Sequence, residues 1–381
     1  MRDITRLAIA DLGELFDGPH ATPKRLAEGP YFLNIASLKA GRLDLSESDH
    51  VSNEDFVRWT RRVTPRLGDL LFSYETRLGE AALMPEGVRA CLGRRMALLR
   101  PNSSVVDPKF LLYFYLSPAF QRMIARHTIH GATVPRIGLA TMPAWKVEIP
   151  SLAVQRPIGE VLGALDDKLA ANERLLCKLD ELDAAEFAEA LTAGNKRTLL
   201  GDLAAFHNRR RIPLSSRERQ GRSGSVPYYG AAGRLDYVDR ALFDERLVLV
   251  GEDGTVIRQD GRPVVQYVWG PAWVNNHAHV LTGRTISTES LRVALGRANV
   301  THLVTGAVQP KISMGNLKTL ALEMPSEMVR LESRIDARAA VFRAISDENK
   351  VLAHTRDELL PLLMSGRVRV KDAETFVEEV V

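Results

Sequence analysis

The chain contains an internal repeat, and this repeat limits the possible folds more than any other feature of the sequence. The tetrapeptide Gly41–Asp44 recurs unchanged as Gly233–Asp236, 192 residues later. Four further similar segments follow the same order in both halves, and they begin at Ala10 and Gly201, Leu70 and Leu247, Gly131 and Gly306, and Glu148 and Glu323. Five ordered matches predict two similar halves, of which the first carries extra loop, mostly between residues 45 and 68.

Each half consists of two parts of different composition. Residues 1–150 and 198–325 hold most of the glycine, proline and aromatic residues, with short apolar runs such as 246–250 and 264–268. Such runs, bounded by glycine and proline, are typical of strands, so these parts should be mixed α/β domains. The parts that follow, 152–192 and 326–364, are rich in Ala, Leu, Glu, Arg and Lys, which favours long helices.

Apolar residues in both helical parts recur at alternating steps of three and four residues, the spacing of a coiled coil. About 40 residues at 1.5 Å each give a rod of roughly 60 Å. A rod cannot bury its stripe alone, so we expect the two rods to pack antiparallel on each other, with one α/β domain at each end. The fold class is therefore predicted as α+β, with two α/β domains joined by two long antiparallel coiled-coil helices in a pseudo-two-fold repeat. The residues expected in the seam are Leu165, Leu169, Asn172, Leu176, Phe342, Ile345, Asn349 and Leu352.

Two of these seam residues, Asn172 and Asn349, interrupt the apolar stripes. They could be exposed near a stagger of the coiled coil, or they could be buried polar residues that fix its register. The sequence leaves both possibilities open.

Composition agrees with an ordinary globular protein, with 45% hydrophobic and 26% charged residues. Cys91 and Cys177 cannot form a disulfide framework, so a reducing cytoplasm is expected. No apolar run reaches the length of about 20 residues that a membrane span needs. The net charge of +4 is compatible with a nucleic-acid partner but does not require one.

Motifs for catalysis and for cofactors are absent from the sequence. It has no phosphate-binding loop of the Gly-x-x-x-x-Gly-Lys-Ser/Thr type, no Asn/Asp-Pro-Pro-aromatic segment and no dinucleotide fingerprint. Residues 273–281 favour a strand on which His277 and His279 would face the same way. Without a nearby acidic or cysteine ligand, a structural role is preferred there over metal binding. Gly251–Gly254 is interpreted as a hairpin turn rather than as a calcium loop.

The pattern resembles the specificity subunits of type I restriction–modification systems, and the resemblance covers the whole chain. Its most specific elements are a Gly-x-x-x-Pro-Arg/Lys-Ile signal in each half and the start of each long helix. The closing leucine-rich, Gly-basic segment is also similar to that of the family. These elements are Gly131–Ile137, Gly306–Ile312, Val154–Ile158, Val329–Ser333 and Leu362–Val370, with an echo of the last at Ala190–Gly194. The second half departs from the pattern with Arg330-Leu331 where the first has Gln155-Arg156.

The resemblance implies a subunit without a catalytic centre or a cofactor of its own. Its expected organisation is a target-recognition domain at 1–150, a central spacer helix at 151–197, a second target-recognition domain at 198–325, and a C-terminal spacer helix and tail at 326–381. Each recognition domain would read half of a split, asymmetric site in double-stranded DNA. The helices would fix the separation of the half-sites and dock modification (methyltransferase) subunits, which carry S-adenosylmethionine; a restriction subunit would join to cleave.

Candidate DNA contacts are cations and amides in loops. Arg136 and Lys311 occupy the same position of the two Gly-x-x-x-Pro signals, and Gln309 lies in the second of them. The other candidates are Arg209 and Arg210, which belong to the basic run Arg209–Arg211, then Arg94 and Asn276. A cation at such a position can bind a phosphate, and an amide can read a base edge. Solvated surface charge is the alternative for each cation.

Two other functions remain possible from the sequence. One is a fragment of a fused restriction–methylation enzyme, which the missing catalytic motifs disfavour. The other is a structural coiled-coil adaptor that does not bind DNA.

Overall fold

The structure is a computed structural model that describes residues 4–19, 22–131, 134–306 and 308–378. The chain divides into two compact units. Unit 1 comprises Met1–Ala171 and Asn349–Val381, and unit 2 comprises Asn172–Glu348. Both long helices pass from one unit to the other, so each unit contains a segment of both.

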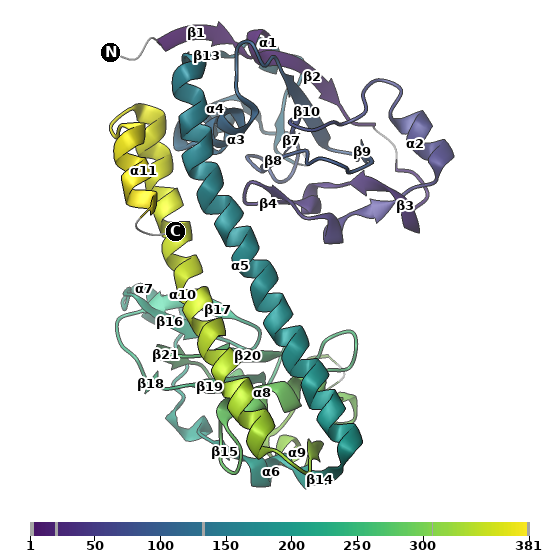
Figure 1. Ribbon diagram of the computed structural model, residues 1–381, viewed down its shortest axis with the longest axis vertical. Helices are drawn as coiled ribbons and strands as arrows, with labels where there is room; N and C mark the ends of the chain where they lie inside the picture. Colours follow the sequence, from purple (N-terminus) through teal and green to yellow (C-terminus); the bar gives the residue numbers. More distant parts are fainter. Residues whose placement is uncertain (1–3, 20–21, 132–133, 307, 379–381) are drawn as a thin grey trace. The chain divides into compact units, whose positions relative to one another are not determined.

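Unit 1 is built around a four-stranded sheet (Figure 1). Its strands follow the order β2 (Gly13–Asp17), β10 (Met96–Pro101), β7 (Leu70–Ser73), β8 (Ala81–Leu83). A three-stranded sheet has the order β6 (Asp49–His50), β3 (Leu26–Leu33), β9 (Ala90–Leu92). Strand pairs are β1 (Ile4–Ala8) with β13 (Lys146–Pro150), β4 (Leu38–Lys39) with β5 (Arg42–Leu43), and β11 (Thr128–Ile129) with β12 (Arg136–Ile137). The helices of this part are α1 (Ile9–Leu12), α2 (Asn53–Trp59), α3 (Pro108–Leu116) and α4 (Pro118–His127).

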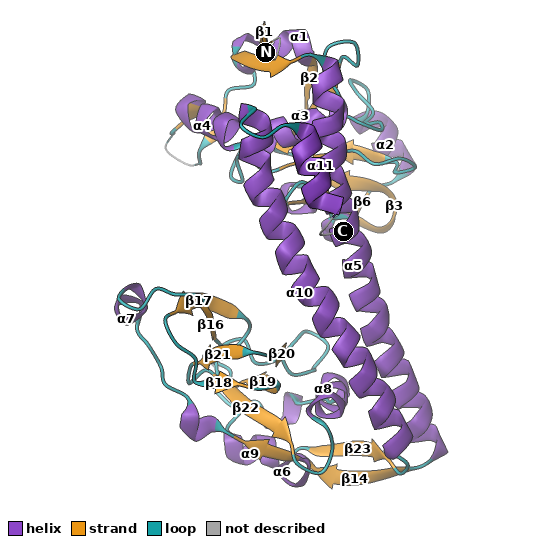
Figure 2. Ribbon diagram, turned by 60° about the vertical axis from the view of Figure 1, so that its left-hand side comes forward, coloured by secondary structure: helices purple, strands orange, loops and turns teal. Residues whose placement is uncertain are grey.

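Unit 2 repeats this plan (Figure 2). Its four-stranded sheet has the order β15 (Ala204–Phe206), β22 (Ala278–Gly283), β19 (Leu247–Gly251), β20 (Val265–Val268). The second sheet has the order β17 (Arg234–Val238), β16 (Val226–Tyr229), β21 (Pro271–Val274), β18 (Phe243–Asp244), and β14 (Asn195–Leu199) pairs with β23 (Ala321–Pro325). The short helices are α6 (Leu200–Leu203), α7 (Ser216–Gln220), α8 (Thr288–Arg297) and α9 (Met314–Lys318).

In the four-stranded sheet of unit 1 and in its counterpart in unit 2, one of the two inner strands, β7 or β19, is buried on both faces; we call it the central strand. In β7, Leu70 and Phe72 belong to the core under α3 and α4, while Leu71 packs on the opposite face. In β19, Val248 and Val250 face α8, while Leu249 faces the second sheet. Alternate side chains of a strand point to opposite faces, so a fully apolar run fits a strand with a core on each side. The repeat in the sequence is therefore a repeat of one fold, as predicted.

The two predicted rods are the helices α5 (Leu152–Ala193) and α10 (Val329–Ser365), and α10 is followed by α11 (Val370–Glu378). Within unit 1, the start of α5 packs against the end of α10: Leu165 and Leu169 share a core with Leu352. Within unit 2, Asn172 contacts Glu348 while Asp183 contacts Arg338. Partners farther along α5 thus lie earlier along α10, which confirms the antiparallel pairing.

Asn172 is buried in this seam. Its side-chain amide donates to Glu348 at 2.6 Å, so the buried polar alternative describes it better than the exposed one. Asn349, Leu176 and Ile345 are half-buried.

Phe342 differs from its predicted position in the seam. Its ring lies 6.4 Å from that of Tyr267 and 6.3 Å from that of Trp269, which both belong to the α/β part of unit 2. The side chain therefore packs the helix onto its own domain. The apolar stripe of α10 serves both the second helix and the domain, and periodicity alone does not distinguish these neighbours.

Candidate nucleic-acid interface

In unit 1, a loop that ends at β12 is attached to the chain leaving the central strand β7. The backbone amide of Ile137 donates to the carbonyl of Tyr74 at 2.8 Å, and that of Thr76 donates to the carbonyl of Pro135 at 3.3 Å. An isolated antiparallel bridge joins Glu75 to Arg136. The first Gly-x-x-x-Pro-Arg-Ile signal therefore closes against the end of the sheet; its residues 132 and 133 lie outside the described part of the chain.

The second signal does the same in unit 2. The amide of Ile312 donates to the carbonyl of Glu252 at 2.8 Å, and that of Gly254 donates to the carbonyl of Pro310 at 3.0 Å. A bridge joins Asp253 to Lys311. Residue 307 of this signal lies outside the described residues. We call this pair of attachments the loop frame; it is present once in each unit.

The loop frames correct the sequence alignment of the halves by one residue. Their hydrogen bonds make Glu75 equivalent to Asp253, whereas the sequence match placed it opposite Glu252. The next residue has a left-handed backbone in both frames, with φ of 69° at Thr76 and 81° at Gly254. Gly254 thus marks a bend within the longer β19–β20 connection rather than a tight hairpin turn.

In each frame, the residue just before the strand next to the central one (β10 or β22) accepts a further backbone hydrogen bond. The amide of Tyr74 donates to the carbonyl of Arg95 at 3.1 Å, and the amide of Glu252 donates to the carbonyl of His277 at 2.8 Å. The side chains pair as well. The guanidinium of Arg95 lies 3.1 Å from the carboxylate of Glu75, and His277 contacts Asp253. The two units therefore use the same positions for a contact between side chains, with different residues in each unit.

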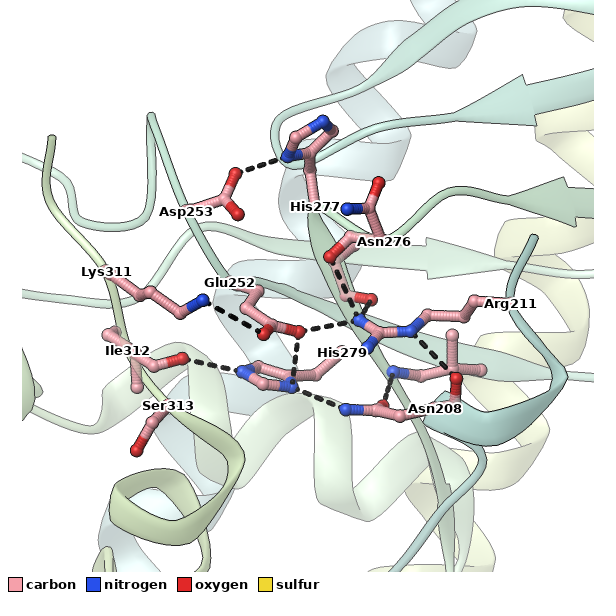
Figure 3. Close-up of polar contacts among 12 residues, drawn as sticks. Asn208, Arg211, Glu252, Asp253, Asn276, His277, His279, Lys311, Ile312 and Ser313 are labelled. Carbon is pink, nitrogen blue, oxygen red and sulfur yellow. Dashed lines mark hydrogen bonds and ion pairs between the residues drawn. The ribbon is translucent and has the colours of Figure 1, made fainter. Parts of the chain in front are cut away.

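In unit 2, Glu252 is the centre of a polar cluster (Figure 3). Its carboxylate lies 2.7 Å from Arg211, 3.4 Å from His279 and 3.6 Å from Lys311. The Arg211 side chain is only 13% exposed, so this member of the predicted basic run holds the domain together instead of facing solvent. Removal of either partner of such a pair would leave the other charge partly buried without a counter-charge, which would destabilise the folded domain.

The hydrogen bonds of His279 define its tautomer. Asn208 accepts a bond from the amide of Val280 through Oδ1, so its Nδ2 donates to Nδ1 of His279 at 2.8 Å. Nε2 of His279 then donates to the carbonyl of Ile312 at 2.8 Å. This imidazole is neutral, and burial, as the largest effect, lowers its pKa.

His277 and His279 do not share a face, contrary to the expectation from a continuous strand. Residues 275–277 form a turn between β21 and β22, so the expected strand over 273–281 is interrupted. His277 is exposed, whereas His279 is buried. Within the described part of the chain, no group of three or more His, Cys, Asp or Glu side chains could hold a metal ion.

Most of the predicted DNA contacts lie on the loop frames. Arg136 and Lys311 are exposed at the equivalent bridge positions, and Gln309 is exposed in the second loop. Arg94 precedes Arg95 and Asn276 precedes His277, so these two exposed residues are also equivalent, which the sequence did not suggest. The structure thus gathers these five candidates at one end of the main sheet of their own unit.

Arg209 and Arg210 lie in a short 3-10 helix, Asn208–Arg210. Arg209 is exposed. Arg210 is paired with Glu245 at 2.6 Å and covers the ring of Phe243 at 4.2 Å, so its guanidinium is held at the surface. The basic run is thereby divided into an exposed, a surface-paired and an internal arginine.

One basic cluster was not found from the sequence. In unit 2, Arg222 and Arg240 lie 5.7 and 5.5 Å from the ring of Trp273, and Arg219 lies 5.2 Å from the ring of Tyr228. Arg219 also pairs with Asp236 at 2.8 Å and Arg222 with Asp239 at 3.8 Å, so these two guanidinium groups are held by carboxylates. The arginines are far from Trp273 in sequence, so no local pattern connected them with this ring.

Charge is unevenly divided along the chain. Residues 1–150 contain 20 Lys and Arg against 16 Asp and Glu, and residues 198–325 contain 16 against 11. The helical segments are acidic, with 6 against 9 in residues 151–197 and 9 against 11 in residues 326–381. The positive charge therefore lies in the two α/β parts, where the candidate contacts are.

None of the helices in the described ranges combines the length and apolar character of a membrane span.

Comparison with known proteins gives one consistent family. Residues 28–181 match the model of the type I restriction modification DNA specificity domain. A putative type I restriction enzyme specificity subunit of Haemophilus influenzae is 30% identical over 134 residues, a match that covers 35% of this chain and about a third (34%) of that relative. The putative MjaX specificity subunit of Methanocaldococcus jannaschii is 20% identical over 379 residues, which cover 88% of this chain and 87% of that protein.

A solved structure agrees with the fold. The type I restriction–modification S subunit of M. genitalium superimposes with a TM-score of 0.60 at 18% identity, over 95% of this chain and 96% of that one. Residues 28–181 thus resemble the DNA specificity domain of type I restriction–modification systems, and the whole chain is similar in sequence to a specificity subunit and shares the fold of a solved S subunit.

Proposed function

We propose that this chain is the non-catalytic, sequence-specific DNA-binding subunit of a type I restriction–modification complex, and that each unit reads one half of a bipartite, asymmetric site. The observation that carries the proposal is the loop frame, which has the same backbone in both units but presents different side chains. A repeated frame supports two readers of one kind. Different side chains support two different half-sites, because base edges are distinguished by their hydrogen-bond patterns.

The candidate contacts fall into two classes by their chemistry. Arg136 and Lys311 are cations at equivalent, exposed positions, where they would bind phosphates and position each unit on the duplex. Gln309 and Asn276 are exposed amides on the frame of unit 2. Such amides can donate to and accept from a base edge, so they are the candidates for sequence readout.

The proposal assigns the chemistry to partner subunits. Modification subunits would dock on this chain and carry S-adenosylmethionine, and a restriction subunit would join them; the chain itself would need no cofactor. The absence of nucleotide-binding and methyltransferase motifs from the sequence supports this division.

Methylation assays with labelled S-adenosylmethionine test the proposal. The chain alone should neither bind this cofactor at micromolar concentration in calorimetry nor label DNA. Its cognate modification subunits should label specific adenines only when the chain is added. A double variant, Arg136→Gln with Lys311→Gln, tests the two phosphate contacts and should lower the labelling. Methylation by the chain alone would contradict a non-catalytic role, and an unchanged site pattern without the chain would contradict a role in specificity.

A further inference from the structure

We infer that unit 1 carries a phosphate-binding pocket for one strand of DNA at the end of α2, in the segment that unit 2 lacks. The inference rests on the proposed function, because it names a contact between the first recognition domain and its DNA. Residues 45–69 stand between the Gly-Arg-Leu-Asp repeat and the central strand, where unit 2 has only residues 237–246. The pocket is therefore a feature of one unit and not of the shared frame.

Local interactions place α2 on the three-stranded sheet. The hydroxyl of Ser52 accepts from the amide of Asp55 and caps the start of the helix, while the hydroxyl of Thr60 donates to the carbonyl of Phe56 at its end. Phe56 and Trp59 pack against the buried cluster of Phe32, Val51 and Cys91. This anchoring fixes the end of the helix, from which the following arginines extend.

The pocket has a volume of about 500 Å³, within the range of roughly 300–1,000 Å³ that ligand sites occupy. Three arginines line it, Arg58, Arg61 and Arg62, against one carboxylate, that of Asp17. Arg62 pairs with Asp17 at 2.8 Å. Among the described residues, neither Arg58 nor Arg61 is paired with a carboxylate, so the pocket carries uncompensated positive charge.

Trp59 provides the second, independent observation. Its indole Nε1 is buried and has no hydrogen-bond partner within the described ranges, and its ring also lines the pocket. A buried donor without an acceptor is unfavourable and rare in native structures. The guanidinium of Arg58 lies 5.6 Å from the same ring. An anionic oxygen in the pocket would pair with the guanidinium groups, and a shift of the Trp59 side chain would let the same oxygen accept from the indole.

The chemistry of the pocket selects a phosphodiester. Arginine presents several N–H groups in a planar fork that matches phosphate oxygens, and such charge-assisted bonds are stronger than neutral ones. Two exposed arginines beside a ring would follow a charged backbone without reading its bases. We therefore assign the pocket to the sugar–phosphate backbone of the half-site that unit 1 reads.

Salt-dependent binding of the full-length chain to a short duplex tests this assignment. Each phosphate contact contributes about 0.9 to the slope of the logarithm of the binding constant against that of the salt concentration. The double variant Arg58→Gln with Arg61→Gln should make the slope shallower by roughly 1.8 and weaken binding about tenfold at moderate salt. The matched control, Arg174→Gln with Lys178→Gln, also removes two exposed charges, but from α5, and should leave the slope unchanged.

A third variant, Trp59→Phe, keeps an aromatic ring but removes the unpaired donor. We expect it to weaken binding several-fold without changing the slope, because the lost group is neutral. The pocket assignment is overturned if the wild-type chain binds the duplex and the arginine variant binds with the same slope. If the wild-type chain shows no salt-dependent binding, the proposed function fails together with it.

The same variants distinguish DNA from a free anion. The fluorescence of Trp59 is obtained as the difference between the wild-type chain and the Trp59→Phe variant. This signal should change when the duplex is added, at concentrations at which inorganic phosphate and a mononucleotide have no effect. A response to inorganic phosphate or the mononucleotide, with none to the duplex, would mean that the pocket holds a small ligand and would contradict the assignment to a DNA strand.

Discussion

The two loop frames share their backbone hydrogen bonds but differ in what lies behind them. In unit 1 the position that accepts from the signal loop is Tyr74, a buried residue of the apolar core. In unit 2 the equivalent position is Glu252, the centre of the polar cluster with Arg211, His279 and Lys311. The comparison indicates that the backbone of the frame belongs to the shared fold, whereas its side chains are free to differ between the two units.

The largest expected difference between the units concerns stability. Substitution of Glu252 by alanine leaves Arg211 without its counter-charge inside the domain, which should cost about 2–4 kcal/mol of unfolding free energy. Substitution of Glu75 by alanine removes a partner of Arg95, whose side chain is 35% exposed, and should cost less than about 1 kcal/mol. Denaturant unfolding of both variants checks this; equal losses would show that the two frames are held by the same forces.

The polar cluster of unit 2 should also make the free energy of unfolding depend on pH. Because burial lowers the pKa of His279, the folded chain binds fewer protons at this site than the unfolded chain does. Stability from this group is then complete above the unfolded pKa of about 6.5 and is lost as the pH falls below it, by at most about 1.4 kcal/mol per pH unit.

Unfolding free energies measured between pH 7 and 5 test this point. The variant His279→Gln cannot be protonated, so its stability should fall less over this interval than that of the wild-type chain. Parallel curves for the two proteins would exclude His279 as a source of the dependence.

The smallest effects are expected where the two frames are most alike. Arg136→Gln and Lys311→Gln should each weaken binding to any duplex by a few-fold and reduce the salt slope by about 1. Lys311 lies 3.6 Å from Glu252, so part of its charge is already compensated and its effect should be the smaller one. A change that depends on DNA sequence would contradict a phosphate contact at these positions.

Local patterns in the sequence were sufficient to predict the two long helices and the two similar domains. The helix expected over 152–192 is α5, Leu152–Ala193, and that expected over 326–364 is α10, Val329–Ser365. Their apolar spacing is a property of neighbouring residues, so one sequence reveals it. The repeat predicted two domains of one fold for the same reason, since it requires only a comparison of the chain with itself.

The candidate site was less accessible from the sequence. The partners of Glu252 come from segments about 40 residues before it and 60 residues after it, and no local pattern connects them. The equivalence of Arg94 with Asn276 depends on strand pairing, because the side chains themselves differ. Phe342 has the right spacing for the helix seam but packs on Tyr267 and Trp269. Spacing along the helix does not determine which neighbour a side chain contacts, because that depends on the tertiary fold.

Exchange of one recognition domain tests the central claim most directly. Residues 198–325 would be replaced by the equivalent domain of a relative with a different site, and the modified adenines would be mapped by methylome sequencing with the modification subunits present. If each unit reads its own half-site, one half of the methylated sequence changes and the other half stays as it was. A change in both halves, or in neither, would contradict the assignment of one domain to one half-site.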